Sequence, residues 1–177
     1  PDGTLLGAQI VGRKGVDKRI DVISTAMCQG MKAQDLAALE LAYAPPYSSA
    51  KDLVNFVGMI AENVLSGLSE VVHFEHLPEG AVLLDAREKD EHELGSVPGA
   101  VNIPLSELRR RWAELPQNRR ILVFCQSGLR SYIAERILKQ QGLQVATVSG
   151  GYLTWKMQQQ PVLSSAAKAL AETPAGP

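Results

Sequence analysis

The chain has 177 residues, of which 45% are hydrophobic and 21% charged, and its formal net charge is −1. This composition is typical of folded globular proteins, and charges of both signs spread along the chain exclude the basic footprint of a nucleic-acid-binding protein or of one held on an anionic membrane. No apolar run approaches the roughly 18 residues of a membrane-spanning helix. Two cysteines do not make a disulfide framework, so we expect a cytoplasmic protein. From the charge distribution and the lack of a long apolar run we expect no nucleic-acid or membrane partners.

The first segment, 1–67, predicts one strand followed by helices. Asp17 and Asp52 each precede an apolar helical pattern, where an aspartate side chain can cap the first turn. The two prolines within 43–52 exclude regular structure there. The elements expected in this segment are a strand at 4–11 and helices at 17–28, 33–41 and 53–65.

The second segment alternates strand and helix patterns. Its strands are short apolar runs, and its helices carry polar residues at helical spacing. This alternation predicts an α/β fold with a largely parallel sheet. The expected strands are 81–87, 100–104, 121–125 and 145–148, and the expected helices are 88–94, 106–115, 131–141 and 152–158.

These patterns divide the chain into a first domain at 1–67, a linker at 68–80 and an α/β domain at 81–160, followed by a flexible tail at 161–177. The opening Pro1-Asp2-Gly3 is a turn signal. Because a turn needs a strand before it, we expect this chain to be a piece of a longer protein.

The stretch FCQSGLRS, Phe124–Ser131, combines residues that can bind an anion beside a thiol. Cys125 closes an apolar strand, at the edge where parallel sheets place their ligand sites. The following amides can turn inward because Gly128 allows the backbone angles of a tight loop. The start of a helix and Arg130 add positive charge, which should lower the pKa of Cys125. The alternative interpretation is a buried cysteine that happens to precede a helix.

Three motifs in this segment resemble those of the rhodanese sulfurtransferases, in the same order along the chain. LLDAREKDEHELGSVPGAVNIPLSEL resembles the first half of the family, FCQSGLRS its active loop, and VSGGYLTW its closing Gly-Gly-x-x-x-Trp. The resemblance covers about 82–155. One departure is Ser96, where the family usually has a histidine of mostly structural role.

The resemblance implies that Cys125 attacks a sulfane sulfur and carries it as a persulfide, with Arg130 as the second catalytic residue. Thiosulfate, persulfides and coenzyme A persulfide are the substrates that it suggests. By family position Asp85 would order the loop rather than react. The residues expected to contribute to substrate binding are Gln126, Ser127, Gly128, Leu129, Ser131, Asp85 and Arg87.

Phosphatases with the rhodanese fold are an alternative within this resemblance. They place one more residue between the cysteine and the arginine, which widens the loop for a tetrahedral phosphate or arsenate. In this chain four residues separate Cys125 from Arg130, and this spacing favours sulfur transfer.

The first segment resembles the C-terminal half of the dimerisation domain of flavin-dependent pyridine nucleotide–disulfide oxidoreductases. The resemblance covers about 3–67, and YAPPYSSAKD is specific to the branch of coenzyme A-disulfide reductases, NADH oxidases and persulfide reductases. It implies a partial α+β dimerisation domain before a rhodanese-like parallel sheet flanked by helices. Tyrosines of this domain approach the partner subunit's reducing site in that branch, which implies such a role for Tyr43 or Tyr47. The alternative is that both tyrosines fill a dimer interface.

The two resemblances together imply a homodimeric parent protein with FAD and NAD(P)H as cofactors and coenzyme A as a substrate. This chain lacks the Gly-x-Gly-x-x-Gly fingerprint and the cysteine of the flavin side, so we expect no cofactor within it. Two functions stay open. The chain is either a competent sulfurtransferase within a flavin-dependent coenzyme A-disulfide or persulfide reductase, or a non-catalytic dimerisation and sulfur-carrier-binding fragment of an NADH-dependent flavin oxidoreductase.

The remaining candidate features have simpler interpretations. GAQIVGRKG lacks the lysine and hydroxyl spacing of a phosphate-binding loop. Cys28 lies on an apparent apolar helix, and we expect it in the core. His73, His76 and His92 lack the spacing of zinc ligands, so we expect surface histidines and no metal. A cluster of arginines predicts a solvated face, or alternatively contact with an anionic substrate such as a coenzyme A phosphate. These arginines are Arg109, Arg110, Arg111, Arg119 and Arg120.

Overall fold

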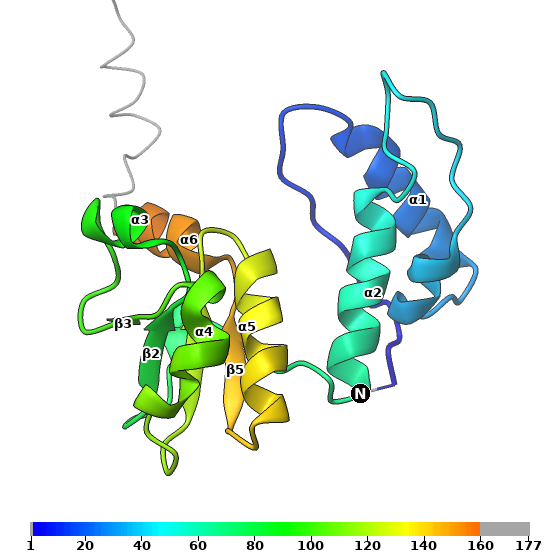
Figure 1. Cartoon of the computed structure of the whole chain (residues 1–177). Coiled ribbons are helices and arrows are strands. Elements are labelled where there is room, and N and C mark those ends of the chain that lie inside the picture. The colour runs from blue at the N-terminus through cyan, green and yellow to red at the C-terminus, as the bar shows by residue number, and fades with distance from the viewer. Residues whose placement is uncertain (1, 160–177) are drawn as a thin grey trace, which may run out of the picture. The chain divides into compact units, whose positions relative to one another are not determined.

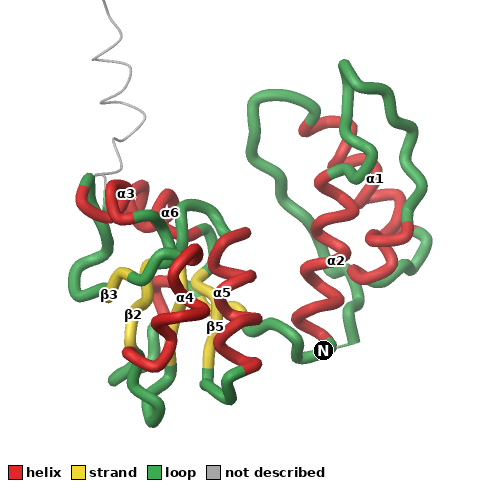
Figure 2. Tube along the Cα trace, viewed as in Figure 1, coloured by secondary structure: helices red, strands yellow, loops and turns green. Residues whose placement is uncertain are grey.

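The computed structural model describes residues 2–159, which form two compact units that meet in sequence between Glu70 and Val71 (Figures 1 and 2). The expected tail, 161–177, lies outside the described residues. None of the helices between residues 2 and 159 is long and apolar enough to cross a membrane.

The first unit is a small helical assembly. Helices α1 (Val16–Cys28) and α2 (Leu53–Leu65) pack with the 3-10 helix η1 (Ala33–Ala38). A Cβ added at Gly58 of α2 would collide with the backbone of Ala37, so glycine lets these two helices touch. The fully buried apolar residues of the unit are Ile23, Ala26, Leu36 and Val54.

Polar contacts tie α2 to both of its neighbours. Asp52 caps α2 by accepting from the amide of Val54 at 3.1 Å, which confirms the expected cap. The same carboxylate accepts from Nε and Nη2 of Arg19 on α1, each at 2.8 Å. The amide group of Asn55 donates to the carbonyls of Leu36 and Leu39 at 3.0 and 2.9 Å. These bonds satisfy polar groups that the packing has removed from water.

Three expectations for the first unit were wrong. The segment 4–11 is no strand: Thr4 makes a single bridge to Lys32, and no second strand pairs with the segment among residues 2–159. Helix α1 starts after Gly15, whose φ is 65°, and Asp17 lies in its first turn without capping it. Cys28 is exposed rather than part of the core. It lies about 200° around the helix from the buried Ala26, since each residue turns the helix by about 100°.

The second unit is an α/β fold with a five-stranded, fully parallel sheet, as the alternating pattern predicted. The strand order is β1-β5-β4-β2-β3. The strands are β1 (Val71–Val72), β2 (Val82–Asp85), β3 (Val101–Asn102), β4 (Ile121–Phe124) and β5 (Val145–Val148). The helices are α3 (Lys89–Glu93), α4 (Leu105–Arg111), α5 (Leu129–Gln140) and α6 (Gly151–Gln158), with 3-10 turns η2 (Phe74–His76) and η3 (Trp112–Glu114).

The sheet takes its first strand from the segment that was expected to be a linker. Val71 and Val72 pair with Thr147 and Val148 of β5, and η2 follows directly. A strand of two residues is too short to show a periodic pattern, which explains why it was missed. The helix expected at 106–115 divides into α4 and η3, and α5 begins two residues earlier than expected, at Leu129.

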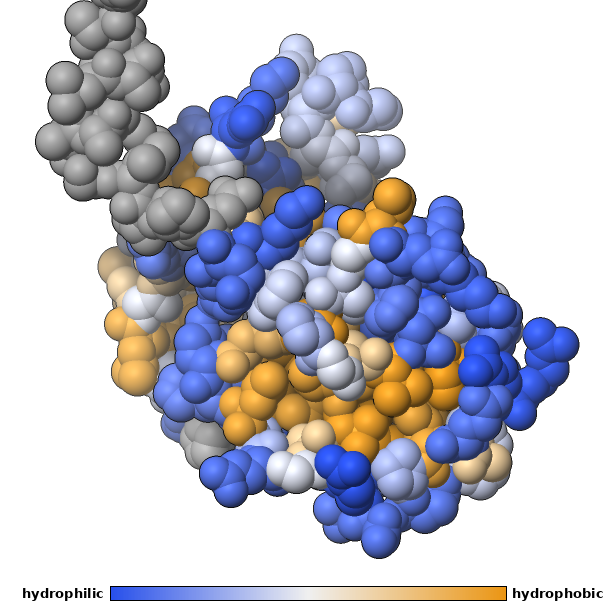
Figure 3. Space-filling model, turned by 90° about the vertical axis from the view of Figure 1, so that its left-hand side faces the viewer, coloured by the Kyte–Doolittle hydropathy of each residue, from blue (hydrophilic) through white to orange (hydrophobic). Residues whose placement is uncertain are grey.

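Helices cover both faces of the sheet. On one face, α4 and α5 lie over a cluster of twelve buried residues that includes Leu84, Val123 and Leu138 (Figure 1). On the other face, α6 and η2 pack on a cluster with five buried and eight partly buried apolar residues. More residues of this cluster are only partly buried than fully buried. Figure 3 shows apolar side chains bordered by hydrophilic ones on one side of the molecule.

Candidate active site

The site forms where β2 and β4 end side by side. Asp85 is paired in register with Phe124, and the amide of Ala86 donates to the carbonyl of Phe124 at 2.9 Å. Cys125 is the next residue, 2% exposed, and its loop runs directly into α5. Gly128 precedes α5 with a φ of 149°, which a residue with a side chain would adopt only under strain. This turn brings the amides of the loop back toward the sulfur.

The Cys125 sulfur lies within a set of hydrogen-bond donors. The amide of Gly128 donates to Sγ at 3.2 Å. Oγ of Ser131 lies 3.7 Å from Sγ, where it can accept from the thiol, and the Ser131 hydroxyl donates to the Gly128 carbonyl at 2.8 Å. Burial alone would raise the pKa of Cys125. Hydrogen bonds from the backbone and hydroxyl of Ser131, and from the amides of Ser127 and Gly128, outweigh burial and hold the pKa below its usual value. The site therefore favours the thiolate, which is the nucleophilic form.

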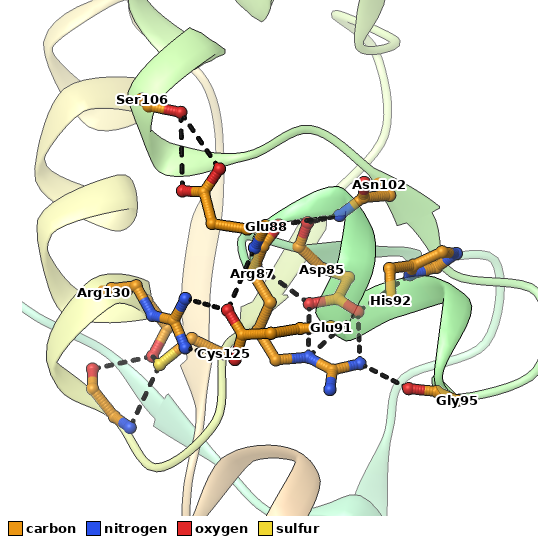
Figure 4. A network of polar contacts seen from close by, with 12 residues as sticks. Asp85, Arg87, Glu88, Glu91, His92, Gly95, Asn102, Ser106, Cys125 and Arg130 are labelled. Carbon is orange, nitrogen blue, oxygen red and sulfur yellow. Dashed lines mark hydrogen bonds and ion pairs between the residues drawn. The ribbon is translucent and has the colours of Figure 1, made fainter.

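Arg130, in the first turn of α5, is held by a carboxylate that no motif in the sequence marks. Its Nη1 and Nη2 both donate to Glu91 of α3, with Nη2 at 2.8 Å from Oε1 (Figure 4). The two side chains are 30% and 31% exposed. The Glu91 carboxylate raises the pKa of Arg130, and the Cys125 sulfur adds to this effect. Arg130 thus lies between a carboxylate and the reactive sulfur.

Asp85 and Arg87 lie beneath the site and are bonded to each other. Their side chains are 0% and 2% exposed, and Nη2 of Arg87 is 2.7 Å from Oδ2 of Asp85. Arg87 also donates to the Gly95 carbonyl at 2.8 Å, and its guanidinium lies 4.1 Å from the ring centroid of Tyr152. These contacts enclose both side chains, and the contribution to substrate binding expected for them stays a prediction.

Ser96 and His92 complete the shell around Asp85. The Ser96 hydroxyl donates to Oδ2 of Asp85 at 2.7 Å, and Nδ1 of His92 is 2.9 Å from the same oxygen. Burial would raise the pKa of Asp85, but the bonds from Arg87, His92 and Ser96 lower it overall. His92 is therefore part of a buried network, unlike the exposed His73 and His76. No group of side chains suited to hold a metal ion occurs within residues 2–159.

The start of α6 fixes the loop from the other side. The amides of Tyr152 and Leu153 donate to the carbonyls of Cys125 and Gln126 at 2.8 and 3.2 Å. A Cβ added at Gly151 would collide with the carbonyl oxygen of Cys125, and Gly151 has a φ of 57°. The closing Gly-Gly turn is thus required for α6 to reach the loop.

Residues 74–158 match the family model of the Rhodanese-like domain. The second unit is a rhodanese-like domain. The chain also resembles reduced Bacillus anthracis CoADR-RHD, with a TM-score of 0.77 and 46% identity over 80% of this chain and 26% of that chain. It resembles a NAD-dependent persulfide reductase from A. fulgidus, with a TM-score of 0.72 and 42% identity over 81% of this chain and 26% of that chain.

Coenzyme A disulfide reductases are among the curated relatives of this chain. The coenzyme A disulfide reductase of Staphylococcus haemolyticus is 53% identical over 60 residues, which are 34% of this chain and 14% of that protein. This chain is therefore homologous to the C-terminal region of such reductases, and it spans about a seventh of this relative's length. A match over 80% of the chain is larger than the rhodanese-like domain, so it also includes part of the first unit.

The remaining expected residues have different environments. In the loop of the rhodanese-like domain, Gln126 is half-buried, Ser127 is exposed, and Leu129 is 72% exposed. Tyr43 and Tyr47 belong to the first unit, where they are 55% and 84% exposed. Tyr43 and Tyr47 thus belong to a different unit from the Cys125 loop, and the roles expected for these residues stay predictions.

The Gly-Gly turn of the rhodanese-like domain does not fit a dinucleotide such as FAD or a nicotinamide nucleotide. Dinucleotides bind where a glycine-rich turn between strand and helix lets the pyrophosphate approach. In the rhodanese-like domain, the turn at Gly150–Gly151 instead contacts the Cys125 loop, so the space is filled by this chain's own backbone.

Proposed function

We propose that the rhodanese-like domain is a sulfurtransferase that carries sulfane sulfur as a persulfide on Cys125. The observation that carries this proposal is the thiol itself. It lies at the end of a buried strand with a lowered pKa, among inward-turned amides and beside Arg130. Such a site can both generate a thiolate and stabilise the anions before and after transfer.

In the first half of the proposed reaction, the Cys125 thiolate attacks the outer sulfur of a donor R–S–S⁻. The S–S bond of the donor breaks, and R–S⁻ leaves with the bonding electrons, so that Cys125 carries the persulfide Cys–S–S⁻. With thiosulfate as donor the leaving group is sulfite. The loop amides that donate to the thiolate now stabilise the outer sulfur. An acceptor thiolate then removes this sulfur in the second half and restores the Cys125 thiolate.

The loop residues have separate tasks in this proposal. The amides of Ser127 and Gly128 and the hydroxyl of Ser131 stabilise the negative sulfur, since each contributes to lowering the pKa of Cys125. Arg130 attracts the anionic part of the donor. Gln126 supplies the carbonyl that anchors the loop to α6, and the exposed Leu129 offers an apolar contact at the mouth. Thiosulfate, organic persulfides and coenzyme A persulfide are the candidate substrates.

We also propose that the domain works within a longer, cytoplasmic reductase of coenzyme A disulfide or persulfide that uses FAD and NAD(P)H. The support is the homology to coenzyme A disulfide reductases and to a NAD-dependent persulfide reductase. A homodimer formed through the first unit, with Tyr43 or Tyr47 near the partner's reducing site, belongs to this proposal. The exposure of these tyrosines and of apolar residues on α2 is consistent with an interface.

The competing function is a non-catalytic fragment whose rhodanese-like domain only binds a sulfur carrier. It predicts a Cys125 that does not take up sulfur. The phosphatase alternative predicts hydrolysis of p-nitrophenyl phosphate, which the four-residue spacing between Cys125 and Arg130 argues against.

Mass spectrometry after incubation with thiosulfate distinguishes these functions. We expect Cys125 to gain about 32 Da, the mass of one sulfur atom, and Cys125→Ser to gain nothing there. Because Cys28 is exposed, the assay uses a Cys28→Ser background, which should leave transfer unchanged. An unmodified Cys125 would support the binding fragment, and hydrolysis of p-nitrophenyl phosphate at a rate comparable to sulfur transfer would support the phosphatase.

A further inference from the structure

The Glu91–Arg130 pair gives the anion site an unusual charge balance. An arginine guanidinium has five N–H donors. Glu91 takes one from each terminal nitrogen, so a donor anion that approaches Arg130 must share it with a carboxylate already in place. The other ion pair near the loop, Asp85 with Arg87, is also internally neutral. The amides and the start of α5 are thus left as the uncompensated positive end of the site.

Glu91 is fixed in this position from its own side as well. Its Oε2 accepts from the amide of Glu88 at 3.2 Å, as part of the capping box that starts α3. The Arg130 bond lowers the pKa of Glu91, so the carboxylate is negatively charged when Arg130 is positively charged. A small dianion that binds at Arg130 therefore meets a negative charge that is held in place by both the α3 backbone and Arg130.

We infer that Glu91 is a positioning and specificity-determining residue of this site. Its carboxylate aims the guanidinium of Arg130 between α3 and the Cys125 sulfur, and it disfavours small dianions relative to donors with a single negative charge. The two hydrogen bonds to Glu91 orient the Arg130 guanidinium. The discrimination between donors comes from repulsion between the Glu91 carboxylate and the second negative charge of a dianion. The consequence for donor choice depends on the proposed sulfurtransferase function, whereas the effect on anion binding does not.

Glu91→Gln tests the inference because it keeps the size and one acceptor oxygen but removes the charge. The probe is sulfate, a dianion that does not transfer sulfur, and the readout is its protection of Cys125 from iodoacetamide in the full chain with Cys28→Ser. We expect the sulfate dissociation constant to fall about three- to fivefold, the scale of a partly exposed ion pair. An unchanged or higher constant would overturn the inference, and this result does not require turnover.

Asp90→Asn is the matched control. Asp90 lies beside Glu91 in the first turn of the same short helix. The substitution removes one negative charge but leaves the two hydrogen bonds between Arg130 and Glu91 in place. Sulfate protection should stay within about 1.5-fold of the parent chain, since charges in solvent are screened. An equal gain in Asp90→Asn and Glu91→Gln would mean that only the overall charge matters, and it would contradict a specific role for Glu91.

A second variant pair separates positioning from damage to the fold. In an Arg130→Ala background, Glu91→Gln should strengthen sulfate protection by less than in the parent chain, because sulfate is no longer drawn to the guanidinium beside Glu91. An equal gain with and without Arg130 would overturn the inference. If the domain turns over thiosulfate, Glu91→Gln should lower KM without raising kcat, whereas a damaged fold would lower kcat and leave or raise KM.

Discussion

The two units of the chain bury their apolar residues in different ways. In the rhodanese-like domain twelve buried residues form one cluster, and β4 and β5 are buried along their whole length. In the first unit four apolar residues are fully buried, and α2 exposes a row of apolar side chains at helical spacing. This row consists of Leu53, Phe56, Val57, Ile60 and Val64, which are 42% to 61% exposed.

The difference shows what an apolar periodicity can and cannot mean. The spacing 53, 56, 57, 60 and 64 marks one face of a helix, and such a face favours burial. It does not say whether the covering surface lies in the same unit. In the rhodanese-like domain the cover is local, whereas within the first unit the row on α2 stays exposed.

The largest effect that tests this comparison is a cavity in the rhodanese-like domain. Leu84→Ala removes a fully buried side chain from β2 and should lower the free energy of unfolding of that domain by about 3 kcal/mol. Both tryptophans, Trp112 and Trp155, lie in this domain, so their fluorescence in a denaturant titration reports on it alone. The matched variant Ile60→Ala lies on the exposed row of α2 in the first unit, which lacks tryptophan, so far-ultraviolet circular dichroism follows it. It should change the stability of that unit by less than about 0.5 kcal/mol. A large loss in Ile60→Ala would show that the row is covered in solution.

A second effect concerns the contact between α6 and the active loop. Gly151→Ala places a Cβ against the carbonyl of Cys125 at a positive φ, and it should destabilise the domain by about 2 kcal/mol. The added Cβ displaces the Cys125 loop itself. The rate of persulfide formation on Cys125 should therefore fall by more than the loss of folded domain, which tryptophan fluorescence measures. Gly142→Ala, also at a positive φ but without a neighbour for its Cβ, is the control for backbone strain alone. Equal losses in the two variants would argue against the loop contact.

The fold of the rhodanese-like domain was largely predictable because its signals are local. Buried strands such as β4 are continuous apolar runs, and the loop that follows Cys125 contains its own glycine and arginine. The wrong predictions involve partners distant in sequence. The segment 4–11 has the composition of a strand but no strand to pair with among the described residues, and β1 becomes a strand only through β5.

The sequence predicted the candidate nucleophile of the site, but not the ion pairs that surround it. Helix α3 carries several acidic residues, and nothing in the sequence distinguishes Glu91 from Asp90 before the fold brings it to Arg130. Arg87 was expected to contribute to substrate binding, which stays a prediction, and its buried ion pair with Asp85 could not be read from the sequence. Charged residues that look alike in the sequence, such as Asp90 and Glu91, thus differ in their contacts only once the chain is folded.

A third effect tests the polar anchor of the first unit. Arg19→Met removes the partner of the buried Asp52 carboxylate and should lower the stability of this unit by about 1–3 kcal/mol. Far-ultraviolet circular dichroism follows it, because the unit is helical and lacks tryptophan. Burial would raise the pKa of Asp52, but Arg19 and the amide of Val54 hold it below its usual value. This contribution is present above the ordinary carboxyl pKa and is lost as pH falls through the lowered value, so parent and variant should converge in acid. A difference that is constant down to strongly acidic pH would contradict the ion pair as its cause.

The smallest effect separates the backbone from the side-chain support of the thiolate. Ser131→Ala removes a hydroxyl bond that lowers the pKa of Cys125 but leaves the amides of Ser127, Gly128 and residue 131 in place. The pH profile of iodoacetamide alkylation is measured in the Cys28→Ser background. Its midpoint should therefore move to higher pH, and the profile should still show one titration, that of Cys125. Ser127→Ala is the control, since only the backbone amide of Ser127 contributes. An unmoved profile in Ser131→Ala would place the whole stabilisation of the thiolate in the backbone, and the rhodanese-like loop would then owe its thiolate to its turn rather than to its serine.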